Sequence, residues 1–406
     1  MDADRLQGIK VIHGGEHMFQ NLLKKWLIFF LLLGLGLPFF AHSTEKKPIL
    51  IGATVSLEGK YKEPSLMIRD AFKLWEKQVN KRGGILGRPI KLILYNDKSQ
   101  KNLVRHYYEK LLSEDKVDLL FSPYGTPLTL VASEVSERYG FVMLVCAASG
   151  EIIWERGYKY VFGVYALAKR YFIGLLDLMA RNGLKSVAIL SENSAFNIDV
   201  ANGAESWAKR FRLTVNYKKA YNNSKLELPV VLKEIRKINP DGLILSAYPT
   251  DCYELLDLMK ASGYRPKVLA LTIAPIHPDF HKNAGSMSER VFGPSQWEPD
   301  ERIPFPGTKK FVNNFKAFTG KMPSYHAGSA YSACQIIEKA VNHSQSLNQQ
   351  QIRDFVSSLD TVTVIGRFKV DHKGKQVGHN PIMIQWQNGK KEIVYPTKMS
   401  TAPALF

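Results

Sequence analysis

The chain has 406 residues, of which 55 are Lys or Arg and 37 are Asp or Glu, for a formal net charge of +18. Apolar residues make up 45% and charged residues 23%, which fits a globular protein and excludes a disordered or collagen-like chain. The length exceeds what one hydrophobic core usually fills, so two lobes are expected. The 3 cysteines are too few for a disulfide-rich scaffold.

An apolar run at residues 26–40 follows two lysines and precedes a small-x-small site at residues 41–43. This order of a basic, an apolar and a small-residue region is typical of a cleaved secretory signal peptide. A transmembrane anchor is the alternative, but the run is short and Pro38 interrupts it. The sequence therefore predicts an exported, soluble protein after a leader at residues 1–43, with Met18 as an alternative start.

The basic charge could suggest a nucleic-acid partner. However, Lys and Arg are spread along the chain, without a basic arm or an aromatic RNA-binding motif. We therefore expect no nucleic-acid binding. The positive charge instead indicates a solvated surface with some attraction to anionic lipid or to an anionic ligand.

From residue 48 onward, apolar runs alternate with amphipathic stretches. The expected elements are a strand at Ile49–Val55, a helix at Ser65–Lys81, a strand at Ile90–Tyr95, a helix at Leu103–Leu112, a strand at Val117–Phe121, a helix at Pro127–Arg138 and a strand at Phe141–Val145. Strands separated by helices predict βαβ units and a parallel sheet.

The same pattern then repeats in a second block of similar size. It predicts a helix at Tyr171–Asn182, a strand at Val187–Leu190, a helix at Val200–Phe211, a strand at Val215–Tyr217, a helix at Val230–Ile238, a strand at Gly242–Ala247, a helix at Tyr253–Ser262 and a strand at Lys267–Leu271. A loop is expected at Trp297–Pro306, then helices at Lys309–Thr319, Ala327–Asn342 and Gln349–Ser358, and strands at Gly366–Asp371 and Pro381–Gln387.

Ligands of open α/β sheets bind beyond the carboxyl ends of the strands. The first such loop is Ser122–Thr126, where Thr126 can cap the helix that opens with Pro127. A helix N-terminus suits a carboxylate, because it offers free N–H groups and a partial positive charge. The alternative is that Thr126 only caps its helix.

The second loop is Cys146–Gly150, where small residues allow close approach to backbone amides and Ser149 adds a hydroxyl. Two such loops from neighbouring strands could hold one carboxylate together. In the second block, Phe196 and Tyr248 are expected in loops that face the same cleft. Ordinary core packing is the alternative for both rings.

Four stretches carry a resemblance to a known family: Leu74–Pro89, Tyr325–Gln335, Gly366–Asp371 and Ile384–Lys390. With them, the chain resembles type 1 periplasmic binding proteins of ABC importers, in the branched-chain amino acid (leucine/isoleucine/valine-binding) group, from about Ile49 to Pro396. The resemblance implies an α/β fold of two Rossmann-like lobes with parallel sheets, joined by a three-crossover hinge. Lobe one would comprise residues 48–165 and 294–365, lobe two residues 166–293 and 366–396, and 397–406 a C-terminal tail.

The resemblance also implies the binding residues. The carboxylate would be held by the hydroxyl of Thr126 and by the loop of Ala147, Ala148 and Ser149, and covered by Phe196 and Tyr248, with Tyr61 and Trp297 lining the cleft. One position departs from the family, because amino-acid binders carry an acidic partner for the α-ammonium where this chain has Ile273. A buried ammonium without an anionic partner is costly, so the ligand either finds another acid or has no ammonium.

By the same resemblance, the function is capture of a small carboxylate ligand, an amino acid or an organic acid, in the interlobe cleft. Lobe closure in the periplasm would precede delivery to an ABC importer permease in the inner membrane. A monomer without cofactor is expected. The alternative function is a ligand-sensing protein of the same fold that signals to a separate membrane partner.

Enzyme motifs are missing from the sequence: there is no Gly-x-Ser-x-Gly elbow, no His-Glu-x-x-His and no P-loop. His277 and His281 are four residues apart, but Pro278 intervenes and no further ligand is near, so no metal site is expected. Cys146 has no histidine placed to activate it and is expected to be a buried thiol. The sequence therefore predicts binding without catalysis.

Overall fold

The computed structural model describes residues 46–300, 302, 303 and 305–406. The chain divides into a unit of residues Met1–Lys46 and a unit of residues Lys47–Phe406. The predicted signal peptide and the choice between Met1 and Met18 lie outside the described residues. In the described part of the chain, no helix is both long and apolar enough to cross a membrane.

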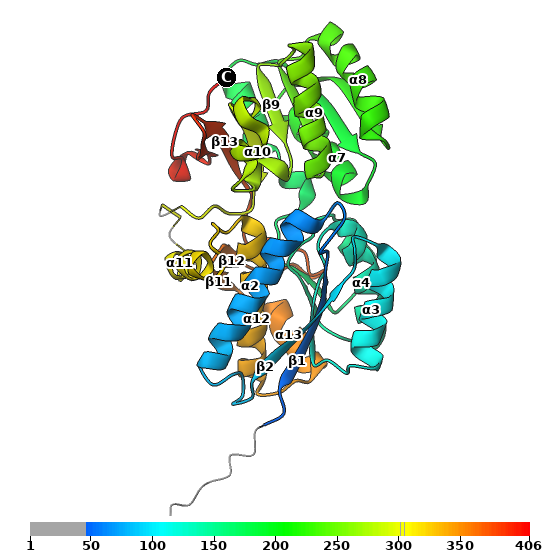
Figure 1. Cartoon of the computed structure of the whole chain (residues 1–406), viewed down its shortest axis with the longest axis vertical. Helices are drawn as coiled ribbons and strands as arrows, with labels where there is room; N and C mark the ends of the chain where they lie inside the picture. The colour runs from blue at the N-terminus through cyan, green and yellow to red at the C-terminus, as the bar shows by residue number, and fades with distance from the viewer. Residues whose placement is uncertain (1–45, 301, 304) are drawn as a thin grey trace, which may run out of the picture. The chain divides into compact units, whose positions relative to one another are not determined.

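The first sheet has five parallel strands in the order β2-β1-β3-β4-β5. They are β1 (Ile49–Val55), β2 (Ile90–Asn96), β3 (Leu119–Phe121), β4 (Met143–Val145) and β5 (Val161–Gly163). In Figure 1, α2 (Lys62–Lys81) and α12 (Tyr325–Ser344) lie on one side of β1 and β2, with α3 (Lys101–Ser113) and α4 (Thr126–Tyr139) on the other. Helices on both faces explain why β1 reads as a nearly continuous apolar run.

The second sheet has seven strands in the order β14-β13-β10-β9-β8-β6-β7. They are β6 (Ser186–Glu192), β7 (Thr214–Tyr221), β8 (Gly242–Ser246), β9 (Val268–Leu271), β10 (Val291–Ser295), β13 (Ile382–Gln387) and β14 (Lys390–Tyr395). Its helices include α6 (Ile173–Arg181), α7 (Ala195–Arg210), α8 (Ser224–Ile238), α9 (Pro249–Ser262) and α10 (Phe280–Ala284). The sheet is mixed, because β13 and β14 run antiparallel to their neighbours.

Smaller elements complete the described fold. They are the helices α5 (Ile152–Glu155), α11 (Thr308–Thr319) and α13 (Gln349–Ser358), the 3-10 turns η1 (Ala168–Arg170), η2 (Ala274–Ile276), η3 (Gly285–Ser288) and η4 (Thr397–Met399), and the two-stranded sheet of β11 (Thr361–Thr363) and β12 (Gly366–Phe368). The C-terminal tail packs on the second sheet, where Phe406 stacks on Phe292.

The two large sheets share one strand order. Taken from their parallel ends, they read β2-β1-β3-β4-β5 and β7-β6-β8-β9-β10. The direction in which successive strands are added to the sheet therefore reverses between β1 and β3 in the first sheet and between β6 and β8 in the second. Ligand sites of doubly wound sheets lie at such switch points, beyond the carboxyl ends of the strands. The loops after these four strands are therefore the place to look for a site.

The α/β fold class and the two blocks expected from the sequence are confirmed. The bounds of Ile49–Val55 and Gln349–Ser358 are as predicted, whereas the strand expected at Val215–Tyr217 extends over Thr214–Tyr221 and the one expected at Gly366–Asp371 ends at Phe368. A tight turn with positive φ at Asn388 and Gly389 connects β13 to β14. Short strands β5 and β10 were not predicted.

Candidate ligand-binding cavity

A small cavity lies beyond the carboxyl ends of β3 and β4 in the first sheet and of β6, β8 and β9 in the second. Its volume is about 10 Å³, which is room for about one water molecule. The residues that line it are Tyr124, Gly125, Thr126, Ala147, Ala148, Ser149, Tyr165, Tyr171, Phe196, Tyr248, Ile273 and Tyr325. The cavity thus gathers six of the eight residues named from the sequence.

The first wall of the cavity is the N-terminus of α4. The helix opens at Thr126 with Gly125 as its N-cap and Pro127 in its first turn. The expectation that Thr126 is the N-cap is therefore wrong, since Thr126 is already helical. Its hydroxyl instead accepts a hydrogen bond from the backbone N–H of Gly150, at 3.0 Å, and so ties the loop after β3 to the loop after β4.

Gly150 is required for this close approach of the two loops. A Cβ atom at position 150 would lie 2.6 Å from the Thr126 methyl group, which is a clash. Because the Thr126 oxygen accepts from Gly150, its own proton remains available for a ligand. Within the described residues, the backbone N–H groups of Ala148 and Ser149 make no hydrogen bond either.

Ser149 completes the polar wall through a chain of hydroxyls. The side-chain amide of Gln296 donates to the hydroxyl of Tyr171 at 3.1 Å, and the Tyr171 hydroxyl lies 3.0 Å from that of Ser149. With Tyr171 accepting from Gln296, its proton can go to Ser149, which leaves the Ser149 proton for a ligand. The wall is therefore a set of neutral donors, which can form charge-assisted hydrogen bonds with a carboxylate.

The opposite wall is aromatic. Phe196 and Tyr248 are buried, at 5% and 3% exposure, and their ring centroids lie 6.0 Å apart. Phe196 was expected in a loop, but it lies in the first turn of α7, whereas Tyr248 is the N-cap of α9. Tyr61, just before α2, contacts the Tyr248 ring at a centroid distance of 4.8 Å without being among the lining residues.

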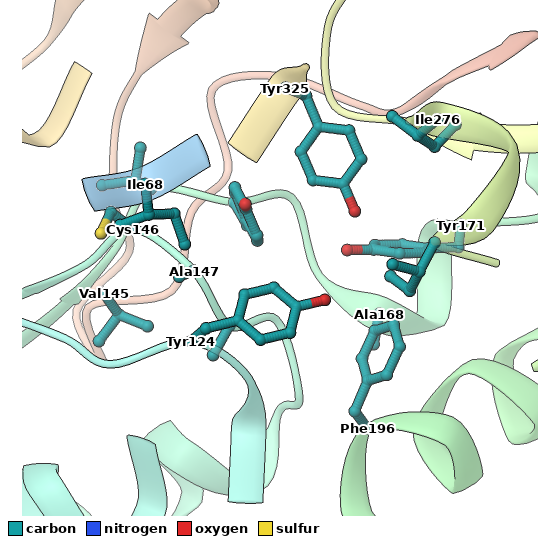
Figure 2. Close-up of a cluster of buried hydrophobic side chains, with 14 of the residues drawn as sticks. Ile68, Tyr124, Val145, Cys146, Ala147, Ala168, Tyr171, Phe196, Ile276 and Tyr325 are labelled. Atoms are coloured by element: carbon teal, nitrogen blue, oxygen red, sulfur yellow. The ribbon is translucent and has the colours of Figure 1, made fainter. Parts of the chain in front are cut away.

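The cavity is also lined by tyrosines that were not predicted from the sequence. Figure 2 shows the hydroxyl groups of Tyr124, Tyr171 and Tyr325 pointing toward one another, with the Phe196 ring beside them. Behind them, the His326 ring stacks on Tyr325 at a centroid distance of 4.1 Å. These residues come from four separate segments, and a buried tyrosine has no local sequence signal that separates a site from a core.

Ile273 lines the cavity with an unusual backbone. Its φ of 40° lies in a region that β-branched residues rarely adopt. Such strain is found mostly where the surrounding structure imposes it, often at binding sites. The side chain brings no charge to the cavity, and none of the lining residues is charged.

The remaining predictions concern Trp297, the Cys146 thiol and the possibility of a metal site. Trp297 is buried but lines a different cavity, of about 420 Å³. Cys146 is buried, as expected, and burial raises the pKa of its thiol to about 12. No group of three or more His, Cys, Asp or Glu side chains suited to a metal ion occurs among the described residues.

Charged groups lie outside the cavity, and Lys60, Glu63 and His277 line a separate cavity of about 380 Å³. The Lys60 ammonium bonds Glu192 of β6 at 2.8 Å and lies 5.1 Å from the ring centroids of Tyr61 and Tyr248. This contact joins the loop after β1 to the second sheet. A second contact between the two halves joins Glu63 of α2 to His277, with Nδ1 and Oε1 3.1 Å apart.

Comparison with known proteins identifies the family of the chain. The model of the periplasmic binding protein family matches residues 48–391. The Leu/Ile/Val-binding protein homolog 8 of Brucella suis is 25% identical over 394 residues, covering 92% of this chain and 97% of that protein. The homolog 7 of the same species is 22% identical over 337 residues, covering 79% and 84%.

Solved structures share the fold. The branched-chain amino acid transporter substrate-binding protein LivJ of Streptococcus pneumoniae, in complex with isoleucine, has a TM-score of 0.78 at 17% identity and covers 86% of this chain and 100% of that one. A solute-binding protein of an ABC transporter from R. palustris, in complex with benzoate, has a TM-score of 0.75 at 18% identity, with 88% and 97% covered. With the family model matched over most of its length, the chain belongs to the type 1 periplasmic binding proteins, in the group of the leucine/isoleucine/valine-binding proteins.

Proposed function

We propose that this protein is the solute-binding component of an ABC importer, acting in the periplasm on a small carboxylate. The observation that carries the proposal is the wall of neutral donors at the switch point of the first sheet. Thr126 and Ser149 each have a hydroxyl proton free for an anion, beside the N-terminus of α4. Charge-assisted hydrogen bonds of this kind are about twice as strong as neutral ones.

The ligand that suits the cavity is a carboxylate without an α-ammonium, such as an aromatic acid. The lining residues carry no acid that could pair with an ammonium. By the resemblance described above, Ile273 stands where the family's amino-acid binders have such an acid. Phe196 and Tyr248 offer ring surfaces to an apolar or aromatic body. The benzoate complex of the R. palustris protein is a precedent on the same fold.

Binding would require the two halves of the protein to part and close again. Ligand pockets usually measure about 300–1,000 Å³, whereas this cavity measures about 10 Å³. The proposed lobes are residues 48–165 with 294–365, and residues 166–293 with 366–396. A ligand that contacts both walls stabilises the closed form, which would then dock on a permease and deliver the ligand without chemical change.

The test is a thermal-shift screen against amino acids and organic acids, followed by calorimetry on the best compound. We expect aromatic or aliphatic monocarboxylates to raise the melting temperature, while leucine, isoleucine and valine have little effect. The double variant Thr126→Ala/Ser149→Ala, screened in parallel, should lose the shift. Tight leucine binding would refute the ligand class, and a shift unchanged in the double variant would refute the proposed carboxylate site.

A further inference from the structure

Gln296 lies where the chain passes between the two large sheets. The chain makes this passage after β5, after β10 and before β13. Gln296 follows β10 and is buried, at 3% exposure. Its side chain contacts the other two passages, because Oε1 accepts a hydrogen bond from the backbone N–H of Ala166 at 2.9 Å and lies 3.3 Å from Nε2 of His379. One side chain therefore contacts all three crossing segments.

Two hydrogen bonds to Ala166 fix which way the Gln296 amide faces. Oε1 accepts from the N–H of Ala166, and Nε2 donates to the carbonyl oxygen of the same residue at 3.2 Å. Turning the amide over would place N–H against N–H and oxygen against oxygen at these two contacts. The second N–H of Nε2 then points to the Tyr171 hydroxyl, 3.1 Å away, so the Tyr171 oxygen is the acceptor of that bond.

The proton of Tyr171 is then available for Ser149. The two hydroxyl oxygens lie 3.0 Å apart. Within the described part of the chain, the Ser149 hydroxyl makes no other hydrogen bond, so a proton received from Tyr171 leaves its own proton directed into the cavity. Tyr325, whose hydroxyl points toward that of Tyr171 in Figure 2, is the competing acceptor.

The two hydroxyls of the polar wall are oriented in different ways. Thr126 accepts from the backbone N–H of Gly150, so the main chain decides where its proton can point. The Ser149 proton is instead oriented by a side chain two hydrogen bonds away. An ionised carboxylate only accepts hydrogen bonds, whereas a carboxamide of the same shape both accepts and donates. A wall whose two hydroxyls both donate should therefore prefer the carboxylate.

We propose that Gln296 is a positioning residue that directs the Ser149 proton into the cavity, so that the site selects a carboxylate over the corresponding carboxamide. This rests on the proposed function, in which a carboxylate is held at this wall. Without the N–H of Gln296, the Tyr171 oxygen can accept from Ser149, and Ser149 then presents a lone pair to the ligand. A lone pair repels a carboxylate and accepts from the NH₂ group of a carboxamide.

The test compares the affinities of benzoate and benzamide for the full chain by calorimetry. Gln296→Met removes the amide and keeps much of the side-chain volume. Gln376→Met is the matched control, because Gln376 is also buried and donates to the first crossing segment, at the carbonyl oxygen of Val164, without a bond to Tyr171. Urea unfolding of both variants measures how much stability each substitution costs.

We expect the ratio of benzoate to benzamide affinity to fall about tenfold in Gln296→Met, the scale of one hydrogen bond to a charged group. The ratio should stay that of the parent in Gln376→Met. An unchanged ratio in Gln296→Met, or an equal fall in both variants, would overturn the proposal, because a general loss of packing does not distinguish an acceptor from a donor.

Neutron diffraction from crystals of the deuterated parent protein tests the same proton order without a ligand or a variant. We expect the Tyr171 deuteron between the hydroxyl oxygens of Tyr171 and Ser149, and the Ser149 deuteron directed into the cavity. A Tyr171 deuteron directed at Tyr325, or a Ser149 deuteron directed at Tyr171, would overturn the proposal. If the parent fails to bind benzoate, the proposed ligand class is wrong, and the neutron map alone decides the proton order.

Discussion

The two walls of the cavity come from two sheets of the same strand order, yet they differ in chemistry. The loops after β3 and β4 present hydroxyls and free amides at Thr126 and Ser149. The segments after β6 and β8 present the rings of Phe196 and Tyr248. Topology therefore fixes where a ligand can sit, while the residues at those positions decide which end of it each wall holds.

This difference assigns separate roles to the walls. The polar wall should set the affinity for an anionic group, and the aromatic wall, with Ile273, should set which molecule carries that group. Variants on the two walls should therefore have separable effects. The experiments on Thr126, Ser149, Ile273 and Tyr248 below either break or sharpen that separation, and one on His326 tests the packing behind the tyrosines.

The largest effect is expected from Thr126→Ala combined with Ser149→Ala. Each lost hydrogen bond to a charged group is worth about 1.5–3 kcal/mol, so calorimetry should show the affinity for a carboxylate ligand weakened by about 3–6 kcal/mol. Thr126→Ser keeps the hydroxyl and is the matched control. Unchanged affinity in the double variant would mean that the carboxylate lies elsewhere.

A second prediction concerns His326, behind the tyrosines. Burial lowers its pKa to about 3, and His277 and Lys391 contribute. Because the unfolded chain binds the proton at a higher pH, near 6.5, this group costs stability as the pH falls from 6.5 toward 3, by about 3 kcal/mol at pH 4. Urea unfolding at pH 7 and pH 4 should show that the free energy of unfolding falls less at pH 4 for His326→Gln than for the parent. An equal fall in both proteins would contradict this prediction.

A third prediction tests Ile273 as the selectivity position. Ile273→Asp supplies a carboxylate for an α-ammonium, so leucine should gain about 2 kcal/mol of affinity relative to benzoate. Competition calorimetry with both compounds measures this ratio, and Ile273→Asn, which is polar but uncharged, is the control. An equal gain in the Asn variant would show that charge is not the cause.

The smallest effect is expected at Tyr248. Its hydroxyl is buried without a hydrogen-bond partner in the described chain, so Tyr248→Phe should leave ligand affinity nearly unchanged. Tyr248→Leu removes the ring and should cost about 1 kcal/mol, the scale of one aromatic contact. If the Phe and Leu variants bound equally weakly, the hydroxyl and not the ring would be the contact.

The residues of the polar wall are easier to predict from the sequence than the tyrosines of the cavity. Thr126 and Ser149 follow apolar strands in loops of small and polar residues, a local pattern that reveals both the strand end and its chemistry. Tyr165, Tyr171 and Tyr325 come from distant segments, and nothing local separates them from core residues, because only the closed tertiary structure brings them to one cavity.

Other differences also have physical causes. The strands β5 and β10 escape prediction because they are short and contain glycine or proline, which weaken strand signals. Trp297 follows β10 and reads as a cleft residue, but its ring packs against Gly328 of α12 and near Phe311 of α11. An apolar side chain in a loop fits a cleft or a core equally well, and tertiary packing decides between them.

The most direct test is a crystal structure of the protein with benzoate or with the best acid from the screen. We expect the carboxylate oxygens within hydrogen-bond distance of the Thr126 and Ser149 hydroxyls, and the body of the ligand against Phe196 and Tyr248. A carboxylate bound at the aromatic wall, or a ligand bound outside the space between the two sheets, would contradict the division of roles between the walls.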